Sequence, residues 1–381
     1  MMGAEMMNVL MMVTWYTPKG SDKLEAGVFH YEQSMALKKY CNVAIWAPFD
    51  QDVEGILEKG EEWDLLTYRS HFTPGRLLKN RNHMFKIFKS IAEDFKPDIL
   101  HAHCAAGAGH YAVWLGKKFG IPVVVTEHSP VELSGVGKLG MSHFFGKYAY
   151  AGSQANICVS RDSRDKLSAI YPKYKFDVIY NGIILPDYEE KEKQFYKEGY
   201  LNIVIVAVLY DLEIKGMKYL LEAIRILKAK GEKVVLHHIG GGEYLEHFKK
   251  LSNELNIEDV CIFHGKCRRK ELYEIVNEMD FFVSASLVEC SGVSVQEAML
   301  LGKPVLGTNS GGVDSLVPKE AGIIVEKANA QALAEGIQQM RSALDRYDTG
   351  WIKKYAYDSF EIDNISKRYM DLYKGLANDS L

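Results

Sequence analysis

Short apolar runs alternate with longer amphipathic stretches along almost the whole chain. Runs such as 8–15 (NVLMMVTW) and 122–126 (PVVVT) have the continuous apolar character of buried strands. Between such runs, stretches such as 217–230 repeat apolar residues at the spacing of one helix face. This alternation predicts parallel sheets that are covered by helices on both faces.

The pattern occurs twice, once in each half of the chain. In the first half we expect strands at 8–15, 43–47, 98–102, 122–126, 155–159 and 177–180, and helices at 28–39, 109–119 and 162–170. In the second half we expect strands at 203–208, 234–239, 260–263, 281–284 and 304–307, and helices at 217–230, 244–255, 270–278 and 294–301.

A polar, charged segment without a clear period separates the two halves, at residues 183–199. A chain of 381 residues also exceeds what one hydrophobic core usually organises. We therefore predict an α/β protein with two doubly wound Rossmann-like domains, residues 1–185 and 186–359. The amphipathic segment 360–376 predicts a last helix, within a C-terminal stretch of about 360–381.

Charge and cysteine usage narrow the class of protein. The net charge is −4, and the parts before and after residue 190 carry 21 basic and 22 acidic, then 25 basic and 28 acidic residues. Neither half is basic, so nucleic acid is not an expected partner. The six cysteines are scattered without a CxxC pair, which indicates free thiols in a reducing cytosol. The sequence contains no apolar run of the ~20 residues that a membrane span needs, and the apolar start is read as the first strand.

Two carboxylates flank a predicted helix start in residues 289–305, ECSGVSVQEAMLLGKPV. Gly292, Val293 and Ser294 stand where backbone N–H groups and the helix dipole suit a phosphate. Glu289 precedes the helix and could accept bonds from sugar hydroxyls, while Glu297 could hold a vicinal diol such as ribose. The alternative is structural, with one capping carboxylate and one solvated carboxylate.

The surrounding segment, SASLVECSGVSVQEAMLLGKPVLGTNSGG, resembles the donor-site signature of retaining glycosyltransferases of family four, which have the GT-B fold. Further segments follow the order of that family: KPDILHAH, GIPVVVTEH, ICVSRDSRDKL and VIYNGI in the first domain, and KGMKYLLEAI and HHIGGGEY in the second. The signature is met here by Ser286, Glu289, Gly292, Glu297-Ala298, Gly302-Lys303-Pro304-Val305 and Gly311-Gly312.

The resemblance implies a GT-B fold whose two domains face each other across a cleft, with the closing helix returning to the first domain. It implies a nucleotide-diphosphate-sugar donor, most often a UDP- or GDP-sugar, and transfer without a metal or cofactor. The donor would meet a glycine loop at Gly27, a basic residue at Lys215, backbone at Gly265 and Lys266, the Glu289 and Glu297 carboxylates, and the loop of Ser291, Gly292, Val293 and Ser294. His128 would lie near the transferred sugar.

This chain departs from the family in the loop that contains Lys215. Family members usually have an arginine earlier in this loop that also holds the diphosphate, but the run VIVAVLYDLEIKG has none. Either another basic residue substitutes, or diphosphate binding depends more on Lys215 and the helix amides. Without the resemblance, Lys215 could be a surface turn residue, Gly27 a plain turn glycine, and His128 a structural strand-end histidine.

His101 and His103 alternate along one strand and therefore share a face. Such a pair could belong to a metal site, but no third ligand stands at useful spacing. We therefore predict no metal site.

Residues 74–91 (PGRLLKNRNHMFKIFKSI) are both basic and apolar. A basic amphipathic helix can lie on an anionic membrane surface, as family members with lipid-linked acceptors do. The alternative is a helix packed on the sheet with a solvated basic face. The expected location is the cytoplasm. If residues 74–91 form a membrane-surface helix, the protein is expected to lie at the inner face of the membrane.

Three functions follow, in order of preference. The first is a retaining, metal-independent sugar transferase that acts on a glycan or lipid-linked acceptor in cell-surface polysaccharide or glycolipid synthesis. The second is a non-catalytic subunit of the same fold, which binds a sugar nucleotide or a partner transferase. The third is a sugar-nucleotide epimerase or hydrolase.

Overall fold

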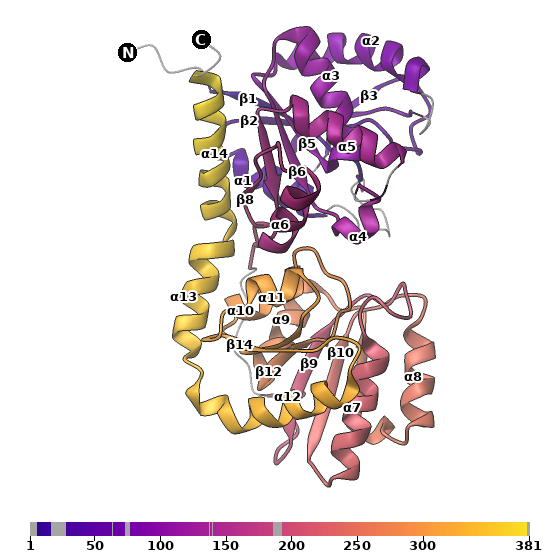
Figure 1. Cartoon of the computed structure of the whole chain (residues 1–381), viewed down its shortest axis with the longest axis vertical. Helices are drawn as coiled ribbons and strands as arrows, with labels where there is room; N and C mark the ends of the chain where they lie inside the picture. The colour runs from indigo at the N-terminus through magenta and orange to yellow at the C-terminus, as the bar shows by residue number, and fades with distance from the viewer. Residues whose placement is uncertain are drawn as a thin grey trace. The chain divides into compact units, whose positions relative to one another are not determined.

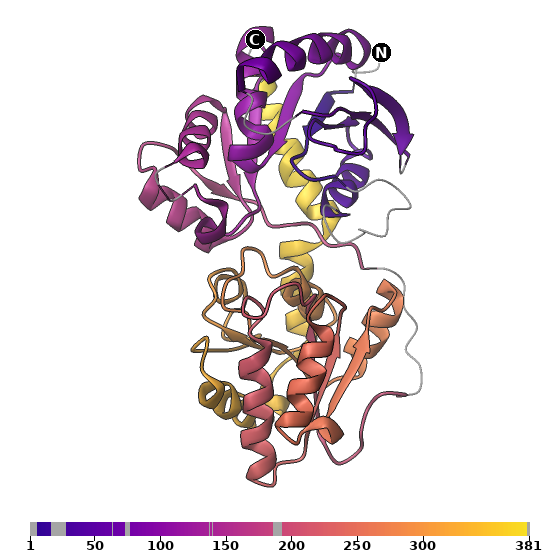
Figure 2. The same ribbon diagram turned by 90° about the vertical axis from the view of Figure 1, so that its right-hand side faces the viewer.

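The computed structural model describes residues 6–16, 28–62, 64–72, 77–136, 138, 140–185 and 193–378. The chain forms two compact units, one of residues 1–182 with 361–381 and one of residues 183–360 (Figures 1 and 2). These divisions fall within three residues of the domain limits that the sequence predicts. Each unit contains its own mostly parallel sheet with its own hydrophobic core, so the predicted doubly wound α/β class is confirmed.

Unit 1 is built on an eight-stranded sheet in the order β3-β4-β2-β1-β5-β6-β7-β8. Its neighbouring strands run parallel except for the antiparallel pair β3–β4 at one edge. The strands are β1 (Asn8–Met12), β2 (Asn42–Ala47), β3 (Glu58–Glu62), β4 (Leu65–Arg69), β5 (Ile99–His103), β6 (Val123–Glu127), β7 (Ala155–Cys158) and β8 (Asp177–Val178). The helices are α1 (Val28–Leu37), α2 (Leu77–Phe95), α3 (His110–Phe119), α4 (Val131–Ser134), α5 (Met141–Gly152) and α6 (Arg161–Ile170), with a π-helical turn η1 (Cys104–Gly109) before α3.

Helix α2 contains most of the basic amphipathic segment, and its apolar side packs inward. Met84, Phe88 and Ile91 are fully buried in the core of unit 1. Phe85 is partly exposed but lies against Trp114 and Phe119. Among its described side chains, the helix therefore packs most of its apolar residues into the core and exposes Lys86 and Lys89 to solvent.

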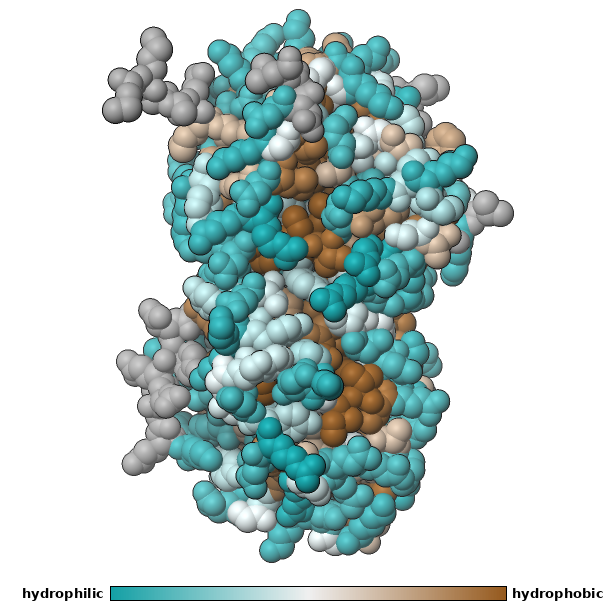
Figure 3. All heavy atoms as spheres, turned by 60° about the vertical axis from the view of Figure 1, so that its left-hand side comes forward, coloured by the Kyte–Doolittle hydropathy of each residue, from teal (hydrophilic) through white to brown (hydrophobic). Residues whose placement is uncertain are grey.

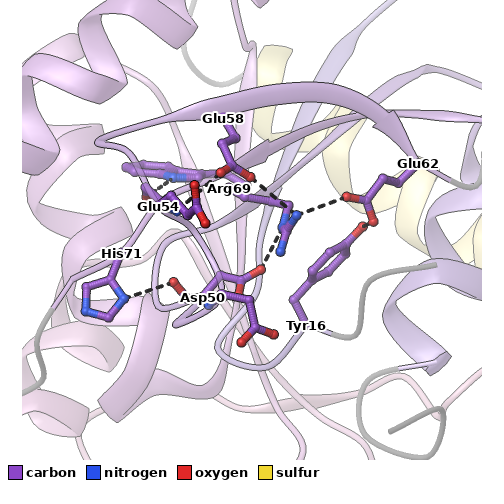
Figure 4. Close-up of polar contacts among 10 residues, drawn as sticks. Tyr16, Asp50, Glu54, Glu58, Glu62, Arg69 and His71 are labelled. Atoms are coloured by element: carbon purple, nitrogen blue, oxygen red, sulfur yellow. Dashed lines mark hydrogen bonds and ion pairs between the residues drawn. The ribbon is translucent and has the colours of Figure 1, made fainter. Parts of the chain in front are cut away.

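The edge strand β3 is attached through a polar network around Arg69 (Figure 4). Arg69 Nε lies 2.7 Å from Asp50 Oδ2, and Arg69 Nη1 lies 3.4 Å from Glu58 and 3.6 Å from Glu62. Tyr16 donates a hydrogen bond of 2.8 Å to Glu62. One arginine thus neutralises carboxylates from β3 and from the loop after β2.

Unit 2 is built on a six-stranded parallel sheet in the order β11-β10-β9-β12-β13-β14. Helix α10 packs against α13, and α7 packs against α12. The strands are β9 (Leu201–Val206), β10 (Val234–Ile239), β11 (Cys261–Gly265), β12 (Phe281–Ser284), β13 (Val305–Thr308) and β14 (Gly322–Val325). The helices are α7 (Met217–Ala229), α8 (Leu245–Glu254), α9 (Arg269–Glu278), α10 (Val293–Leu300), α11 (Gly312–Leu316), α12 (Ala330–Ala343) and α13 (Thr349–Phe360), with short 3-10 turns η2 (Glu258–Val260) and η3 (Leu344–Arg346).

The last helix, α14 (Ile362–Asn378), belongs to unit 1 although it follows unit 2 in the sequence. It packs against α1 (Figure 1). Tyr373 Oη lies 2.6 Å from His101 Nδ1, and Tyr369 Oη lies 3.3 Å from Thr126 Oγ1. These buried contacts connect α14 to strands β5 and β6.

The face of the molecule in Figure 3 is largely hydrophilic, with smaller hydrophobic areas between the polar side chains. Within the part of the chain that the structure describes, no helix combines the length and the apolar composition that crossing a bilayer requires.

Candidate functional site

The strand order of unit 2 reverses between β9 and β12, and polar side chains meet beyond these two strands. Lys215 lies in the loop after β9, and Glu289 lies in the loop after β12. Lys215 Nζ is 2.7 Å from Glu289 Oε2, although the residues are 74 positions apart. Ser286 Oγ donates to the same oxygen at 3.5 Å. Open parallel sheets bind ligands at such a reversal of strand order.

Gly216 allows these two loops to approach each other. Its φ angle is 62°, and a Cβ atom there would lie 1.9 Å from the carbonyl oxygen of Ala285. Beside it, the Leu287 N–H donates to the Ile214 carbonyl at 2.8 Å. A larger residue at position 216 would separate the loops and with them Lys215 and Glu289.

Gly292 begins helix α10 in the left-handed conformation, with a φ angle of 59°. Ser291 is buried, Ser294 is half-buried, and the Val293 side chain is exposed. The Gly312 N–H donates to the Glu289 carbonyl at 2.8 Å and so fixes the loop from the other side. The predicted phosphate-binding residues therefore surround the positively polarised end of α10.

Glu297 lies on α10, and two side chains of helix α9 hold its carboxylate. Tyr273 Oη donates to Glu297 Oε1 at 2.6 Å, and Arg269 Nη2 donates to the same oxygen at 3.2 Å. The Glu297 side chain is only 14% exposed. Burial raises the pKa of the Glu297 carboxyl, while the charge of Arg269 opposes that rise. Glu297 is therefore neither a solvated carboxylate nor a helix cap.

Arg269 and Tyr273 are not among the residues that the sequence predicts. They stand four positions apart on α9, so they share a helix face, and Arg269 Nε donates to Tyr273 Oη at 3.0 Å. An arginine in the first turn of the helix after β11 is the sequence signal that could have identified the pair. Through Arg269 the site gains a second cation besides Lys215.

Gly265 ends β11 and Lys266 follows it, beside the glycine-rich loop that follows β10. The Gly265 carbonyl accepts a hydrogen bond of 2.8 Å from the Gly240 N–H. Gly265 has a φ angle of 72°, and Lys266 is exposed. A Cβ on Gly241 would lie 3.8 Å from the Cβ of Lys266, which brings the two loops into contact. The reading of a nucleotide base at Gly265 and Lys266 stays a prediction.

The predicted sites in unit 1 are His128 and Gly27. Gly27 lies outside the described residues. His128 follows β6, and its Nε2 lies 2.7 Å from His103 Nδ1. Burial lowers the pKa of His128 to about 3, so the ring is neutral near pH 7.

No third ligand stands at useful spacing in the sequence beside His101 and His103, but the fold brings two further histidines next to His103. Helix α1 brings His30 beside His103, with ring centroids 4.4 Å apart, and His128 approaches from β6. One ring nitrogen each from His30, His103 and His128 all lie within 4.8 Å of one another. The spacing along the sequence could not reveal this group, because its members come from three separate elements.

Two protein-family models match the chain in tandem. The model of glycosyltransferase family 4 matches residues 26–185, and the model of glycosyl transferases group 1 matches residues 187–346. With the two parallel-sheet units, these matches define the class. The chain belongs to the family-4-like glycosyltransferases of the GT-B type, as its sequence signature predicts.

Curated relatives include proteins of glycolipid and polysaccharide synthesis. The chain is 26% identical over 297 residues to the alpha-monoglucosyldiacylglycerol synthase of Streptococcus pneumoniae, covering 72% of this chain and 65% of that protein. It is 26% identical over 380 residues to the putative teichuronic acid biosynthesis glycosyltransferase TuaC of Bacillus subtilis, covering 92% and 93%. The match to the first relative thus spans just under two thirds of its length.

Solved structures of similar fold include the HepE protein of Anabaena in complex with UDP and glucose. That structure has a TM-score of 0.75 at 17% identity and covers 97% of this chain and 100% of the other. Sucrose-phosphate synthase from Thermosynechococcus elongatus also has a TM-score of 0.75, at 18% identity, with coverage of 97% and 99%. At these identities the likeness establishes the fold alone.

Proposed function

We propose that this protein is a retaining glycosyltransferase that moves a sugar from a nucleotide-diphosphate sugar to a glycan or lipid-linked acceptor. A UDP- or GDP-sugar is the proposed donor, and cell-surface polysaccharide or glycolipid synthesis is the proposed role. The names of the curated relatives and the UDP bound to the HepE protein support these choices.

The contact between Lys215 and Glu289 beside the start of α10 carries the proposal. Cleavage of the donor passes through an oxocarbenium-like state, and the leaving diphosphate gains negative charge. Lys215 and the amides at residues 292–294 would stabilise that charge more in the transition state than in the ground state. Transfer would then need no divalent cation at the diphosphate.

The two carboxylates have different roles in this proposal. Glu289 accepts hydrogen bonds from hydroxyls of the transferred sugar, and Lys215 holds it in position while approaching the diphosphate. Glu297 accepts the ribose hydroxyls. Both bonds from α9 end on Glu297 Oε1, so we assign the ribose hydroxyls to Oε2. Gly265 and Lys266 contact the base.

His128 binds a hydroxyl of the transferred sugar, in its neutral form. A neutral imidazole can accept or donate one hydrogen bond at the nitrogen that faces the sugar. Because Glu289 is assigned to the sugar hydroxyls, retention is proposed without a covalent intermediate on Glu289.

The acceptor is proposed to reach the enzyme from the cytoplasmic side, at the inner face of the membrane where it is lipid-linked. Because the apolar side of α2 is packed in the core, only its basic face could meet a bilayer, through exposed Lys86 and Lys89. Such contact would be electrostatic, and flotation with liposomes should then depend on anionic lipid and be reversed by salt. Flotation independent of anionic lipid would exclude it.

A donor panel tests the proposed function directly. UDP, GDP, ADP and their common sugars are added to the wild type and to Glu297→Gln, with and without EDTA, and the melting temperature is followed. A ligand that binds the native state raises that temperature by mass action. Stabilisation of the wild type by one nucleotide class, with little effect on Glu297→Gln, is expected.

The same panel distinguishes the alternatives. Release of free nucleotide from the stabilising donor without any acceptor would favour a hydrolase, and a new sugar nucleotide would favour an epimerase. Binding without turnover toward any acceptor would favour a non-catalytic subunit. Dependence on metal would overturn the metal-independent part of the proposal. Product NMR then assigns the anomeric configuration and tests retention.

A further inference from the structure

We propose that His30, His103 and His128 form a binding site for a divalent transition metal of the Zn²⁺ type inside unit 1. The three rings come from α1, from the end of β5 and from the loop after β6. Strand order in unit 1 reverses between β1 and β5, so the group lies by the strand ends where open parallel sheets bind ligands.

The geometry of the rings carries the proposal. Ring centroids are 4.4 Å apart for His30 and His103, 5.0 Å for His103 and His128, and 5.4 Å for His30 and His128. One nitrogen of each ring lies within 4.8 Å of the other two. Around a tetrahedral Zn²⁺ with Zn–N bonds of about 2.05 Å, two ligand nitrogens lie about 3.3 Å apart. Because His103 Nδ1 and His128 Nε2 are 2.7 Å apart, binding of one ion requires side-chain rotations that change these spacings.

His103 is the central member of the group. Its Nδ1 is in hydrogen-bond contact with His128 Nε2 at 2.7 Å. Its Nε2 is buried and has no hydrogen-bond partner among the described residues. A buried polar atom without a partner is unfavourable, and a metal ion would satisfy it. The hydrogen bond between His103 and His128 contains one proton, and a nitrogen that carries a proton cannot bind a metal ion. On metal binding, this proton would move to another ring nitrogen, or one of the two rings would bind the ion through its other nitrogen.

The three rings lie in the interior of unit 1. His30 and His103 are buried, and His128 is half-buried, so an ion held by them would be shielded from solvent.

His101 supports the group without being one of its ligands. Its ring stacks on His103 with centroids 4.5 Å apart. Its two nitrogens contact Tyr373 Oη at 2.6 Å and Thr126 Oγ1 at 2.7 Å, so both are occupied. Groups that hold a ligand ring in a fixed orientation raise the metal affinity of a site.

The ligand set selects the kind of metal. Three imidazoles without a carboxylate suit Zn²⁺, Co²⁺, Ni²⁺ or Cu²⁺ and disfavour Mg²⁺ and Ca²⁺, which prefer oxygen ligands. All three histidines belong to unit 1, and His128 is also the residue proposed to bind the transferred sugar. Binding is therefore measured without any nucleotide sugar.

The test uses the full chain after removal of metal by a chelator. The wild type, His30→Gln and His103→Gln are titrated with Zn²⁺, and bound metal is counted after equilibrium dialysis. One Zn²⁺ per wild-type chain is expected, with affinity at least about tenfold weaker in each variant. His264→Gln is the matched control, because His264 forms a two-histidine contact with His237 in unit 2, at 3.0 Å. Near-ultraviolet circular dichroism verifies the fold of each variant.

Spectroscopy on the wild type gives a second measurement that needs no variant at the site. X-ray absorption of the zinc-loaded protein should show imidazole nitrogens at about 2.0–2.1 Å and no sulfur at about 2.3 Å. Cys267→Ser serves as background, because Cys267 is the one cysteine that is not buried. Sulfur ligation, the absence of stoichiometric binding, or unchanged binding in folded His30→Gln would overturn the proposal.

Discussion

Tyr273 donates a hydrogen bond of 2.6 Å to the Glu297 carboxylate, from a helix that lies 24 positions earlier in the sequence. The tyrosine is fully buried, and burial together with the nearby Glu297 charge raises its pKa. It therefore remains a donor throughout the physiological range. The hydrogen bond fixes the mostly buried Glu297 carboxylate of α10 against α9.

Replacement of this tyrosine by phenylalanine tests the pair. Tyr273→Phe should lower the free energy of unfolding by about 1–3 kcal/mol, because it leaves a poorly solvated carboxylate oxygen with one partner fewer. It should also weaken donor binding, which titration calorimetry can measure. Tyr219→Phe, at a half-buried tyrosine on α7, is the control. Equal stability and equal donor affinity in wild type and Tyr273→Phe would contradict the assignment of Glu297.

Lys215 should affect catalysis rather than stability. Lys215→Ala should reduce kcat about 10²–10³-fold, because it removes a charged donor from the leaving diphosphate. The melting temperature should change little, since Lys215 and Glu289 are both partly exposed and such ion pairs contribute little to stability. Lys218→Ala, an exposed lysine at the start of α7, should behave as wild type. A Lys215→Ala enzyme with the wild-type rate would remove Lys215 from the mechanism.

The buried histidines of unit 1 predict a loss of stability in acid. Burial lowers the pKa of His101 to about 3, below its ordinary value of 6.5. Between these two pH values the unfolded chain binds a proton at His101, whereas the folded chain keeps the ring neutral. Stability is then full above pH 6.5 and falls as the pH drops toward 3. Each such histidine contributes a slope of up to about 1.4 kcal/mol per pH unit.

Urea unfolding between pH 7 and pH 4 measures that slope. His103→Gln should make the free energy of unfolding less dependent on pH, because it removes one histidine that stays neutral in the folded chain. His83→Gln, at an exposed histidine, should leave this pH dependence unchanged. A His103→Gln slope as steep as that of the wild type would contradict the prediction.

The contact between α14 and the sheet should contribute measurably to the stability of unit 1. Tyr373→Phe removes the hydroxyl that contacts His101 Nδ1, and both groups are buried. We expect a loss of about 1–3 kcal/mol in the free energy of unfolding. Tyr357→Phe, at an exposed tyrosine of α13, serves as the control. Equal unfolding midpoints for the two variants would show that the contact adds nothing.

Arg69 should determine whether the edge strand stays attached (Figure 4). Arg69→Met leaves the Asp50 carboxylate, which is only 6% exposed, without its cation. We expect faster amide hydrogen exchange in β3 and β4 and a loss of about 1–3 kcal/mol. Lys89→Met, in an exposed ion pair with Glu93, should alter neither. Unchanged exchange in β3 after Arg69→Met would show that strand pairing alone holds the edge.

The central strands could be predicted from the sequence because buried parallel strands are continuous apolar runs. The predicted strands at 234–239 and 281–284 coincide with β10 and β12. Strand β3, with the sequence EKGEE, was not predicted, because it is an exposed edge strand without an apolar side. Its conformation comes from pairing with β4 and from Arg69, and neither leaves a local pattern.

The candidate site residues divide in the same way. Lys215 and Glu289 could be predicted as donor-binding residues because each follows a predicted strand, and the chain resembles a family with these residues in that order. Arg269 could not be assigned, because its role arises from a contact with Glu297, 28 positions away. His30 could not be assigned either, because it meets His103 from a separate element. Periodicity describes how a segment packs, but it contains no information about which distant side chain it meets.

The return of α14 to unit 1 has a consequence for the order of synthesis. Residues 1–182 leave the ribosome long before α14, yet Tyr369 and Tyr373 fill buried positions beside β5 and β6. While unit 2 is being translated, the positions beside β5 and β6 that α14 covers in the finished protein therefore remain uncovered. Unit 2 is closed by α13 and can mature first, although it begins later. Completion of the first unit therefore depends on α14, which is synthesised after the whole of unit 2.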